Sequence, residues 1–341
     1  MIRYAVFRTD KIGDLVVSLP VAEAIKEGDP GAAVTFVTSP RTAEIARACP
    51  FIDGVLEHDE NVRSLRAVRD LARKVRSARP DVAVFLRPTL TAALATLAAG
   101  VPTRVGTAYR YFSPLFTKRV REHRRYATKH ELDYNLGILA AVLRPPARTY
   151  LPRIVVPETS EQYAREALAE RGLARKSFAI VHPGSARSAR NFPIGAYAAL
   201  ADFLECDLGV RVLVTGADPE AGLIAEMASH RRTRSLTLVG APGLLHLTAV
   251  IGEACLLISG STGPMHLAGA VGTPTVSFFS PVRSTSPRRW RALGPRAEVI
   301  LPPVPECPTC VGKDCKYFDC MDRIPMDAAK EAVRRALETC R

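Results

Sequence analysis

Short apolar runs alternate along the chain with longer segments whose apolar residues recur every three or four positions. A short apolar run is typical of a buried strand, and the longer recurrence is typical of a helix with one buried face. In the first half this pattern predicts strands at residues 2–7, 32–38, 53–56 and 81–86, and helices at 15–26, 42–48, 62–78 and 131–143. Alternating strands and helices predict a doubly wound parallel sheet.

The second half repeats the same alternation. It predicts strands at residues 178–182, 210–216, 235–240, 254–259 and 274–279, and helices at 194–205, 219–229, 244–253, 265–271 and 326–339. The predicted fold class is therefore α/β, with two Rossmann-like doubly wound domains.

The proline-rich segment 144–157 is the predicted linker between these halves. We expect an N-terminal domain at 1–150 and a C-terminal domain at 151–325. The helix in 326–341 is expected to pack back towards the N-terminal domain. Two Rossmann-like halves imply a cleft between them, with ligands bound at the carboxyl ends of the strands.

Composition and charge narrow the class of protein. Of 341 residues, 47% are hydrophobic, and Arg3 interrupts the only apolar stretch at the N-terminus. The longest uncharged stretch, 88–103, falls short of the roughly 20 apolar residues that span a bilayer. These features predict a soluble cytoplasmic protein. The net charge of +13 favours an anionic partner, namely nucleic acid, a phosphorylated substrate or an acidic membrane, unless it only reflects liberal use of Arg.

A polar turn follows the predicted strand 254–259. It reads Gly260-Ser261-Thr262-Gly263-Pro264-Met265-His266 and leads into a helix. A glycine-bracketed turn at a helix start directs backbone N–H groups and the positive end of the helix dipole at one point. The turn is therefore either an anion site, most simply for phosphate, or one of the ordinary strand–helix turns of an α/β protein that bind nothing.

The first predicted strand ends in Arg8-Thr9-Asp10-Lys11-Ile12-Gly13-Asp14. This is not the GxGxxG pattern of nicotinamide-binding proteins. Asp14 lies at a helix start, where it is either a helix cap or a general base at the mouth of the cleft. Asp10 competes for either role.

Two further loops follow strands of the second half. The loop after strand 178–182 carries Ser185, Arg187 and Arg190. These residues could bind a diphosphate, but they are equally typical of a solvated basic loop. Asp218 follows the next strand, where it is either a helix cap or an acceptor of hydrogen bonds from ribose or sugar hydroxyls.

Residues 104–130 carry eight Lys or Arg against one acidic residue, interleaved with Tyr and Phe. The segment interrupts the strand–helix alternation. The segment could form a surface that binds an anionic acceptor, or a surface that binds single-stranded nucleic acid through stacking of aromatic rings on bases. It could also be a solvated loop without a binding role.

Cys307, Cys310, Cys315 and Cys320 form a C-x₂-C-x₄-C-x₄-C pattern. The first pair has the spacing of zinc ligands, but the second pair does not complete the usual partner. Reduced thiols in a loop are the favoured interpretation, and a structural zinc is the alternative.

Three segments in this order and separation resemble the heptosyltransferases of glycosyltransferase family 9. They are RTDKIGDLVVSLP, VHPGSARSARNFP and ISGSTGPMHLAGAVGTPTVSFF, and the likeness extends over nearly the whole chain, the CPTC stretch included. The resemblance implies a GT-B fold with an acceptor-binding N-terminal domain and a nucleotide-sugar-binding C-terminal domain. It also implies inverting transfer of heptose from ADP-heptose to the lipopolysaccharide inner core, without a required metal.

Residue by residue, the resemblance makes Asp14 the catalytic base. It assigns donor contacts to Arg190, which meets the diphosphate, to Asp218, and to Thr262, Gly263 and His266 of the phosphate turn. Ser185 and Ser261 complete the predicted donor set, although many heptosyltransferases carry Asp where this chain has Ser261. The predicted acceptor-binding residues are Asp10, Lys11, Arg119, Arg121, Arg124 and Arg125.

The partners expected on this basis are a nucleotide sugar, an anionic glycolipid of the lipid A and Kdo type, and the inner face of the cytoplasmic membrane. Nucleic acid is not expected. The alternatives are a family member with another nucleotide sugar, a sugar-nucleotide epimerase, and a non-catalytic module that binds anionic glycolipid or nucleic acid.

Overall fold

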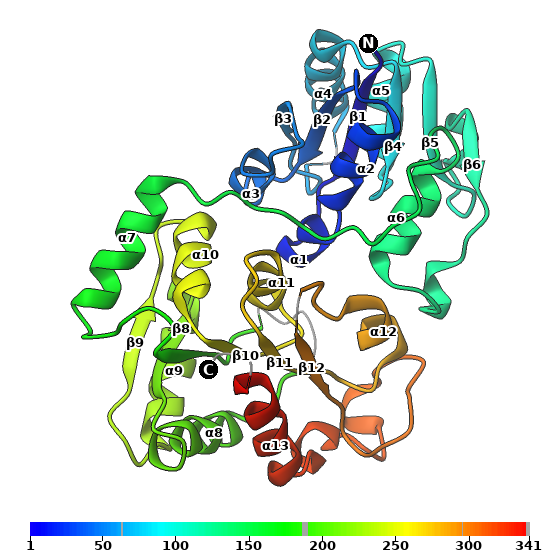
Figure 1. Ribbon diagram of the computed structural model, residues 1–341. Coiled ribbons are helices and arrows are strands. Elements are labelled where there is room, and N and C mark those ends of the chain that lie inside the picture. The colour runs from blue at the N-terminus through cyan, green and yellow to red at the C-terminus, as the bar shows by residue number, and fades with distance from the viewer. Residues whose placement is uncertain (63, 186–189, 295, 339–341) are drawn as a thin grey trace. The chain divides into compact units, whose positions relative to one another are not determined.

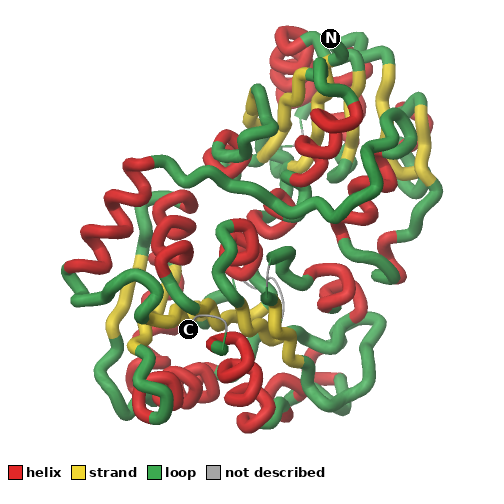
Figure 2. Tube along the Cα trace, in the orientation of Figure 1, coloured by secondary structure: helices red, strands yellow, loops and turns green. Residues whose placement is uncertain are grey.

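The chain forms two compact units in the computed structural model, Met1–Val155 and Val156–Arg341 (Figure 1). The structure describes residues 1–62, 64–185, 190–294 and 296–338. The division falls inside the proline-rich segment 144–157, five residues beyond the predicted boundary at 150. In each unit the strands form one sheet flanked by helices (Figure 2).

The first unit contains a parallel sheet of six strands in the order β3-β2-β1-β4-β5-β6. Its strands are β1 (Arg3–Arg8), β2 (Ala33–Thr38), β3 (Gly54–Glu57), β4 (Val82–Phe85), β5 (Thr103–Thr107) and β6 (Lys118–Val120). Its α-helices are α1 (Ile12–Val16), α2 (Pro20–Gly28), α3 (Ala43–Arg47), α4 (Leu65–Ala78), α5 (Leu90–Ala98) and α6 (Glu131–Leu139). Helices α4 and α5 bury one face of the sheet, where the rings of Phe7 and Phe85 stack with centroids 4.6 Å apart.

The second unit repeats this architecture with the strand order β12-β11-β10-β7-β8-β9. Its strands are β7 (Phe178–His182), β8 (Arg211–Gly216), β9 (Leu236–Val239), β10 (Leu256–Gly260), β11 (Thr275–Phe278) and β12 (Ala297–Ile300). Its α-helices are α7 (Glu158–Ala169), α8 (Ile194–Cys206), α9 (Ala221–Ser229), α10 (Leu244–Glu253), α11 (Gly263–Ala270), α12 (Pro287–Trp290) and α13 (Met326–Leu337). Figure 1 shows α8, α9 and α13 on one side of the sheet and α7, α10 and α11 on the other.

The C-terminal helix α13 is part of the second unit. Ala329, Ala332, Val333 and Ala336 are fully or almost fully buried in the same cluster as Val276 and Phe278 of β11. The structure therefore sets no unit boundary at residue 325. The expected packing of this helix towards the N-terminal domain stays a prediction.

One sequence prediction about the first unit is wrong, and one segment holds strands that were not predicted. The helix expected at 15–26 is two helices, because Pro20 lacks an N–H group and its ring clashes with the carbonyl of the preceding turn. The segment 104–130 interrupts the strand–helix alternation as expected, because β6 follows β5 with no α-helix between them, and both strands extend the sheet in parallel register. Both strands are short, and β6, which lies at the edge of the sheet, carries the exposed cations Lys118 and Arg119, as edge strands often do.

A close contact between backbones fixes the position of α11. A Cβ atom on Gly269 would lie 2.6 Å from the carbonyl oxygen of Leu293, and the Cα atom of Gly269 packs against Gly294. We expect Gly269→Ala to destabilise the protein by about 1–3 kcal/mol, because neither backbone can move aside cheaply. Urea unfolding followed by circular dichroism measures this loss.

Gly222→Ala in α9 is the matched control, since a Cβ atom there meets nothing within 4 Å. It is expected to stabilise the helix by roughly 0.5–1 kcal/mol. Equal stability changes for the two variants would contradict the contact at Gly269.

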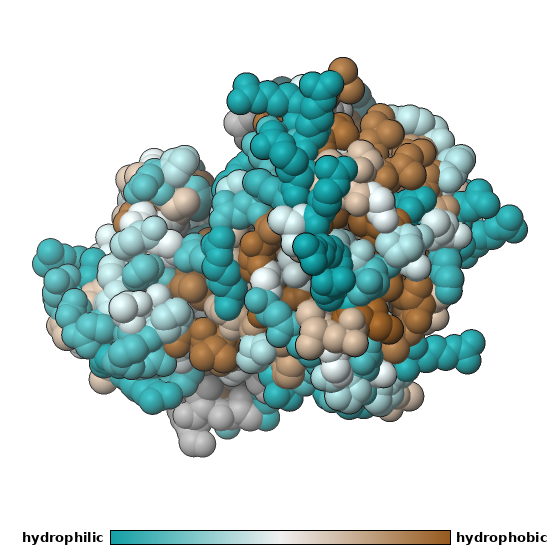
Figure 3. All heavy atoms as spheres, turned by 90° about the horizontal axis from the view of Figure 1, so that it is seen from above, coloured by the Kyte–Doolittle hydropathy of each residue, from teal (hydrophilic) through white to brown (hydrophobic). Residues whose placement is uncertain are grey.

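Hydrophilic residues cover much of the face seen in Figure 3, and many of their long side chains project from it. Hydrophobic residues emerge between them in separate patches, as is normal for a folded protein. Among the described residues, no helix is long and apolar enough to cross a membrane.

Candidate functional site

Polar residues of the first unit meet where the strand order reverses. Strands β2 and β3 lie on one side of β1, and β4, β5 and β6 lie on the other. Arg8 ends β1, Asp14 lies in the first turn of α1, and Arg87 follows β4. Ligands of doubly wound sheets bind at such a reversal point, outside the carboxyl ends of the strands.

The Arg8 guanidinium binds three carboxylates. Its side chain is only 2% exposed; Nε lies 2.9 Å from Asp10, and its terminal nitrogens donate to Asp14 and, over 3.1 Å, to Glu131. Burial lowers the pKa of Arg8, but attraction to Asp10, Asp14 and Glu131 outweighs burial and raises it. Arg8 therefore remains charged and holds the three carboxylates together.

The carboxyl group of Asp10 is buried within this ion-pair group. Burial raises the pKa of its carboxyl to about 7, with Asp14 acting in the same direction and Arg8 and Arg87 opposing. The unfolded chain releases this proton near pH 4. Asp10 therefore favours the folded state below about pH 4, and this contribution is lost as the pH rises through about 7.

We expect the free energy of unfolding of the wild type, relative to Asp10→Asn, to fall as the pH rises from about 4 to about 7. The difference should then be constant at higher pH. Urea unfolding of both proteins across this range measures it. A difference that is constant from pH 4 to 8 would show that Asp10 titrates normally.

Arg8, Asp14 and Glu131 also belong to a closed ring of hydrogen bonds. Arg124 donates to Glu131 over 2.5 Å and to the side chain of Asn135 over 3.1 Å. Asn135 donates to Ser18 over 3.0 Å, and Ser18 donates to the backbone carbonyl of Asp14 over 2.7 Å. Arg8 closes the ring between Glu131 and Asp14, so the position of Asp14 depends on residues from β1, α6 and the loop before α6.

The predicted acceptor residues fall into two groups. Lys11, Arg119, Arg121 and Arg125 are exposed, and Arg125 lies over the ring of Tyr126. Arg124 and Asp10 are instead held in the ion-pair group, with their side chains 23% and 15% exposed. The exposed residues are better placed to meet a large anionic acceptor than Arg124 is.

The second unit has its reversal point between β7 and β10. The turn after β10 leads directly into α11, with Thr262 at the N-cap. Thr262 is buried, and its hydroxyl has no hydrogen-bond partner among the described residues, although an N-cap Thr normally bonds the first helical turn. The N–H groups of Gly263 and Met265 precede the intrahelical bonding pattern, so hydroxyl and backbone donors converge at one helix start.

His266 and Ser261 flank this turn. His266 is buried and meets the ring of Trp290 edge-on, with centroids 6.5 Å apart. Ser261 donates its backbone N–H to the carbonyl of Phe278 over 3.1 Å, which ties the turn to β11.

The loop after β7 lies beside this turn because β7 and β10 are parallel neighbours. Ser185 and Arg190 are described, whereas Arg187 lies outside the described residues. Asn191 fixes the end of the loop: its amide donates to the Pro183 carbonyl, and its oxygen accepts the Tyr197 hydroxyl over 3.1 Å. Arg190 approaches Cys320, with Nη1 3.9 Å from Sγ.

Glu220 is a site residue that sequence reasoning missed. Its carboxylate accepts the Ala217 N–H over 3.0 Å and lies 3.8 Å from His182 Nε2. It also lies so close to Gly184 that a Cβ atom there would overlap it at 2.2 Å. Asp218, the predicted residue, is exposed and lies against Gly240. Glu220 is therefore the acidic group that faces the loop after β7.

The four thiols of the Cys307–Cys320 segment are all described and unbonded to one another. Cys320 is buried and Cys310 exposed. In the described ranges, no group of three or more His, Cys, Asp or Glu side chains is placed to hold a metal ion. Whether the segment binds a structural zinc, the alternative to reduced thiols, is not decided by this arrangement.

Comparison with known proteins identifies the family of the chain. Residues 68–320 match the family model of glycosyltransferase family 9 (heptosyltransferase). A putative glycosyltransferase of Haemophilus influenzae is 28% identical over 301 residues, which are 86% of each chain.

Two solved structures share the fold. A family 9 glycosyl transferase of Veillonella parvula superposes with a TM-score of 0.86 at 21% identity, covering 99% of this chain and 97% of that one. The ADP-heptose lipopolysaccharide heptosyltransferase II of Escherichia coli superposes with a TM-score of 0.79 at 21% identity, covering 99% of both chains. The chain has the GT-B fold and belongs to glycosyltransferase family 9, and it is a glycosyltransferase.

Proposed function

We propose that this glycosyltransferase moves heptose from ADP-heptose to the inner core of lipopolysaccharide with inversion at the anomeric carbon. The observation that carries the proposal is the start of α11. There a buried Thr262 hydroxyl without a partner and the free N–H groups of the first turn lie at the reversal point of the second sheet. A diphosphate is the ligand chemistry that this arrangement favours.

The choice of ADP-heptose rests on the family and on one relative. The family model is named for heptosyltransferases, and the Escherichia coli structure with the same fold is an ADP-heptose enzyme. Arg190 and Ser185 from the loop after β7 would add charge and a hydroxyl beside the phosphates. Glu220 is placed to accept hydrogen bonds from sugar or ribose hydroxyls.

In the proposed reaction, Asp14 takes the proton from the acceptor hydroxyl as its oxygen attacks the anomeric carbon of the donor. The new glycosidic bond forms while the bond from that carbon to the diphosphate oxygen breaks, and the nucleoside diphosphate leaves with the electron pair. Arg190 and the donors at the start of α11 stabilise the charge that the leaving group gains. The chain contains no D-x-D sequence, so protein groups would supply this stabilisation without a metal.

The acceptor would be an anionic glycolipid at the inner face of the cytoplasmic membrane. The exposed cations Lys11, Arg119, Arg121 and Arg125 suit phosphate and carboxylate groups, and the chain carries a net charge of +13.

A thermal-shift panel of ADP-, UDP- and GDP-sugars tests the donor. A ligand at 100 times its Kd stabilises the native protein by about 2.7 kcal/mol, so the donor and its nucleoside diphosphate should raise Tm more than the other nucleotide sugars. We expect ADP-heptose and ADP to do so, and Thr262→Val to reduce the shift. A selective shift with a UDP- or GDP-sugar would replace ADP-heptose by that donor, and no release of nucleotide in the presence of acceptor would rule out transfer.

A further inference from the structure

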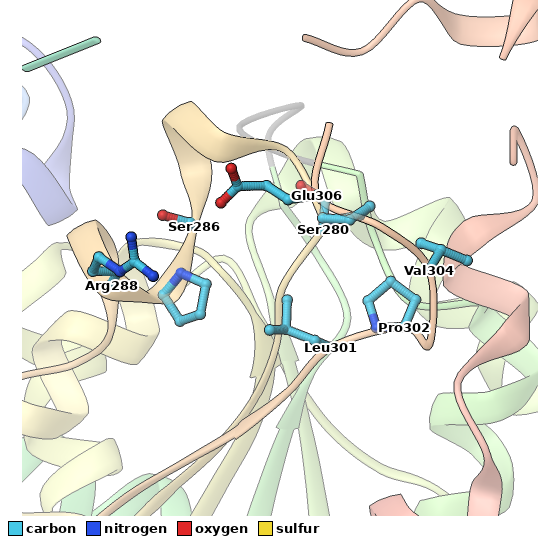
Figure 4. A pocket seen from close by; sticks show the side chains of 9 residues that line it. Ser280, Ser286, Arg288, Leu301, Pro302, Val304 and Glu306 are labelled. Atoms are coloured by element: carbon cyan, nitrogen blue, oxygen red, sulfur yellow. The ribbon is translucent and has the colours of Figure 1, made fainter. Parts of the chain in front are cut away.

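A cavity with a mixed polar and apolar lining opens in the second unit, beyond the carboxyl ends of β11 and β12. Its volume is about 170 Å³. Leu301 and Pro302 follow β12, Ser286 and Arg288 lie at the start of α12, and Glu306 comes from the loop that follows (Figure 4). The donor, acceptor and catalytic residues assigned above do not line it.

The lining combines hydroxyl, charged and apolar side chains. In Figure 4 the polar ends of Ser286, Arg288 and Glu306 lie above and to the left of the apolar surface of Leu301 and Pro302. Arg288 is exposed and has no hydrogen bond or ion pair with any described residue, so its donors are available. Glu306 is held in place by Arg283, whose Nε lies 2.6 Å from Oε1.

This combination discriminates between ligand classes. A carboxylate disfavours an inorganic anion, and a guanidinium disfavours a purely hydrocarbon ligand. A sugar ring presents hydroxyls that both donate and accept, together with C–H faces that pack on apolar side chains. The volume holds about five or six waters at roughly 30 Å³ each, which suits one ring, because pockets for drug-sized ligands start near 300 Å³.

The cavity is connected to the phosphate turn through one short helix. Arg288 and Trp290 lie on α12, and the ring of Trp290 meets His266 of α11. Trp290 Nε1 donates to the Ser284 carbonyl over 2.9 Å, which fixes that ring. A ligand in the cavity therefore lies at the carboxyl ends of the strands, as the proposed diphosphate site does, because β10, β11 and β12 are parallel neighbours.

We propose that this cavity is a sugar-binding subsite in which Arg288 and Glu306 bind the hydroxyls of one ring. The inference rests on the proposed function for its source of sugar: the ring belongs either to the transferred sugar of the donor or to a sugar of the acceptor.

Arg288→Ala tests the subsite, with Arg234→Ala as the matched control. Arg234 is also exposed, has no hydrogen bond or ion pair with a described residue, and precedes β9 at the opposite edge of the sheet. Calorimetric titration with ADP and ADP-heptose, and the KM for a Kdo-lipid A acceptor, are measured for both variants and the wild type. Neither variant should change the Kd of ADP.

A rise of about tenfold in the Kd of ADP-heptose for Arg288→Ala assigns the cavity to the donor sugar. A similar rise in the acceptor KM, with both nucleotide affinities unchanged, assigns it to the acceptor. Saturation-transfer NMR with free heptose and free Kdo gives a readout that does not need the proposed reaction. Transfer to one of these sugars that is lost in Arg288→Ala supports the subsite, even if ADP-heptose is not the donor. No transfer from the wild type, or equal transfer from both proteins, overturns the proposal.

Discussion

Asp14→Asn is expected to lower kcat by about 10²–10⁴-fold, the usual contribution of a general base. The amide cannot take a proton from the acceptor hydroxyl, and no described side chain is placed in the same turn of α1 to replace it. The fold should persist, because Arg8 keeps its contacts with Asp10 and Glu131. Donor affinity should also persist, because the proposed phosphate site lies in the other unit. Steady-state kinetics, Tm and ADP-heptose titration measure these three quantities.

Asp10→Asn is the matched control, since both carboxylates bind the same guanidinium. We expect it to retain turnover within about tenfold of the wild type, because Asp10 lies between two guanidinium groups, those of Arg8 and Arg87, whereas Asp14 pairs with Arg8 alone among the described residues. A large loss of kcat in Asp10→Asn, with little loss in Asp14→Asn, would move the base to Asp10. Near-wild-type kcat in a folded Asp14→Asn protein would remove Asp14 from the mechanism.

The central strands could be predicted because strands buried on both faces consist mainly of apolar residues. The runs that form β4, β7 and β10, and the middle of β1, are almost wholly apolar, as expected of strands covered on both faces. The edge strands β6 and β12 were missed because they are short and only partly buried. Their pairing is decided by the neighbouring strand and not by their own composition.

The same distinction applies to the candidate site. Asp14 and Thr262 could be singled out because each lies in a local turn whose chemistry can be read from adjacent residues. Glu220 was not singled out, because the family resemblance assigned the acidic donor contact to Asp218, whereas the approach of Glu220 to Gly184 depends on the β7–β8 pairing. The contact between Arg8 and Glu131 joins residues 123 positions apart, and only the packing of α6 brings them together.

The second large effect is expected for Glu131. Its side chain is 1% exposed and accepts hydrogen bonds from both Arg8 and Arg124. Glu131→Gln removes the charge between two guanidinium groups, and breaking a buried ion pair of this kind costs about 3–5 kcal/mol. We expect a marked fall in Tm. In protein that remains folded below the new Tm, we also expect a lower kcat and a displaced pH profile, since Arg8 can then move away from Asp14.

Glu57→Gln is the control for this variant. Glu57 pairs with Arg47 over 2.5 Å, but both side chains are substantially exposed, and such pairs contribute about 0–1 kcal/mol. Thermal unfolding of both variants should separate the buried pair from the exposed one. The pH profile of kcat then separates positioning from simple loss of fold, because a merely less stable protein keeps the profile of the wild type. An unshifted profile in Glu131→Gln would confine Glu131 to a structural role and leave Arg8 alone to position Asp14.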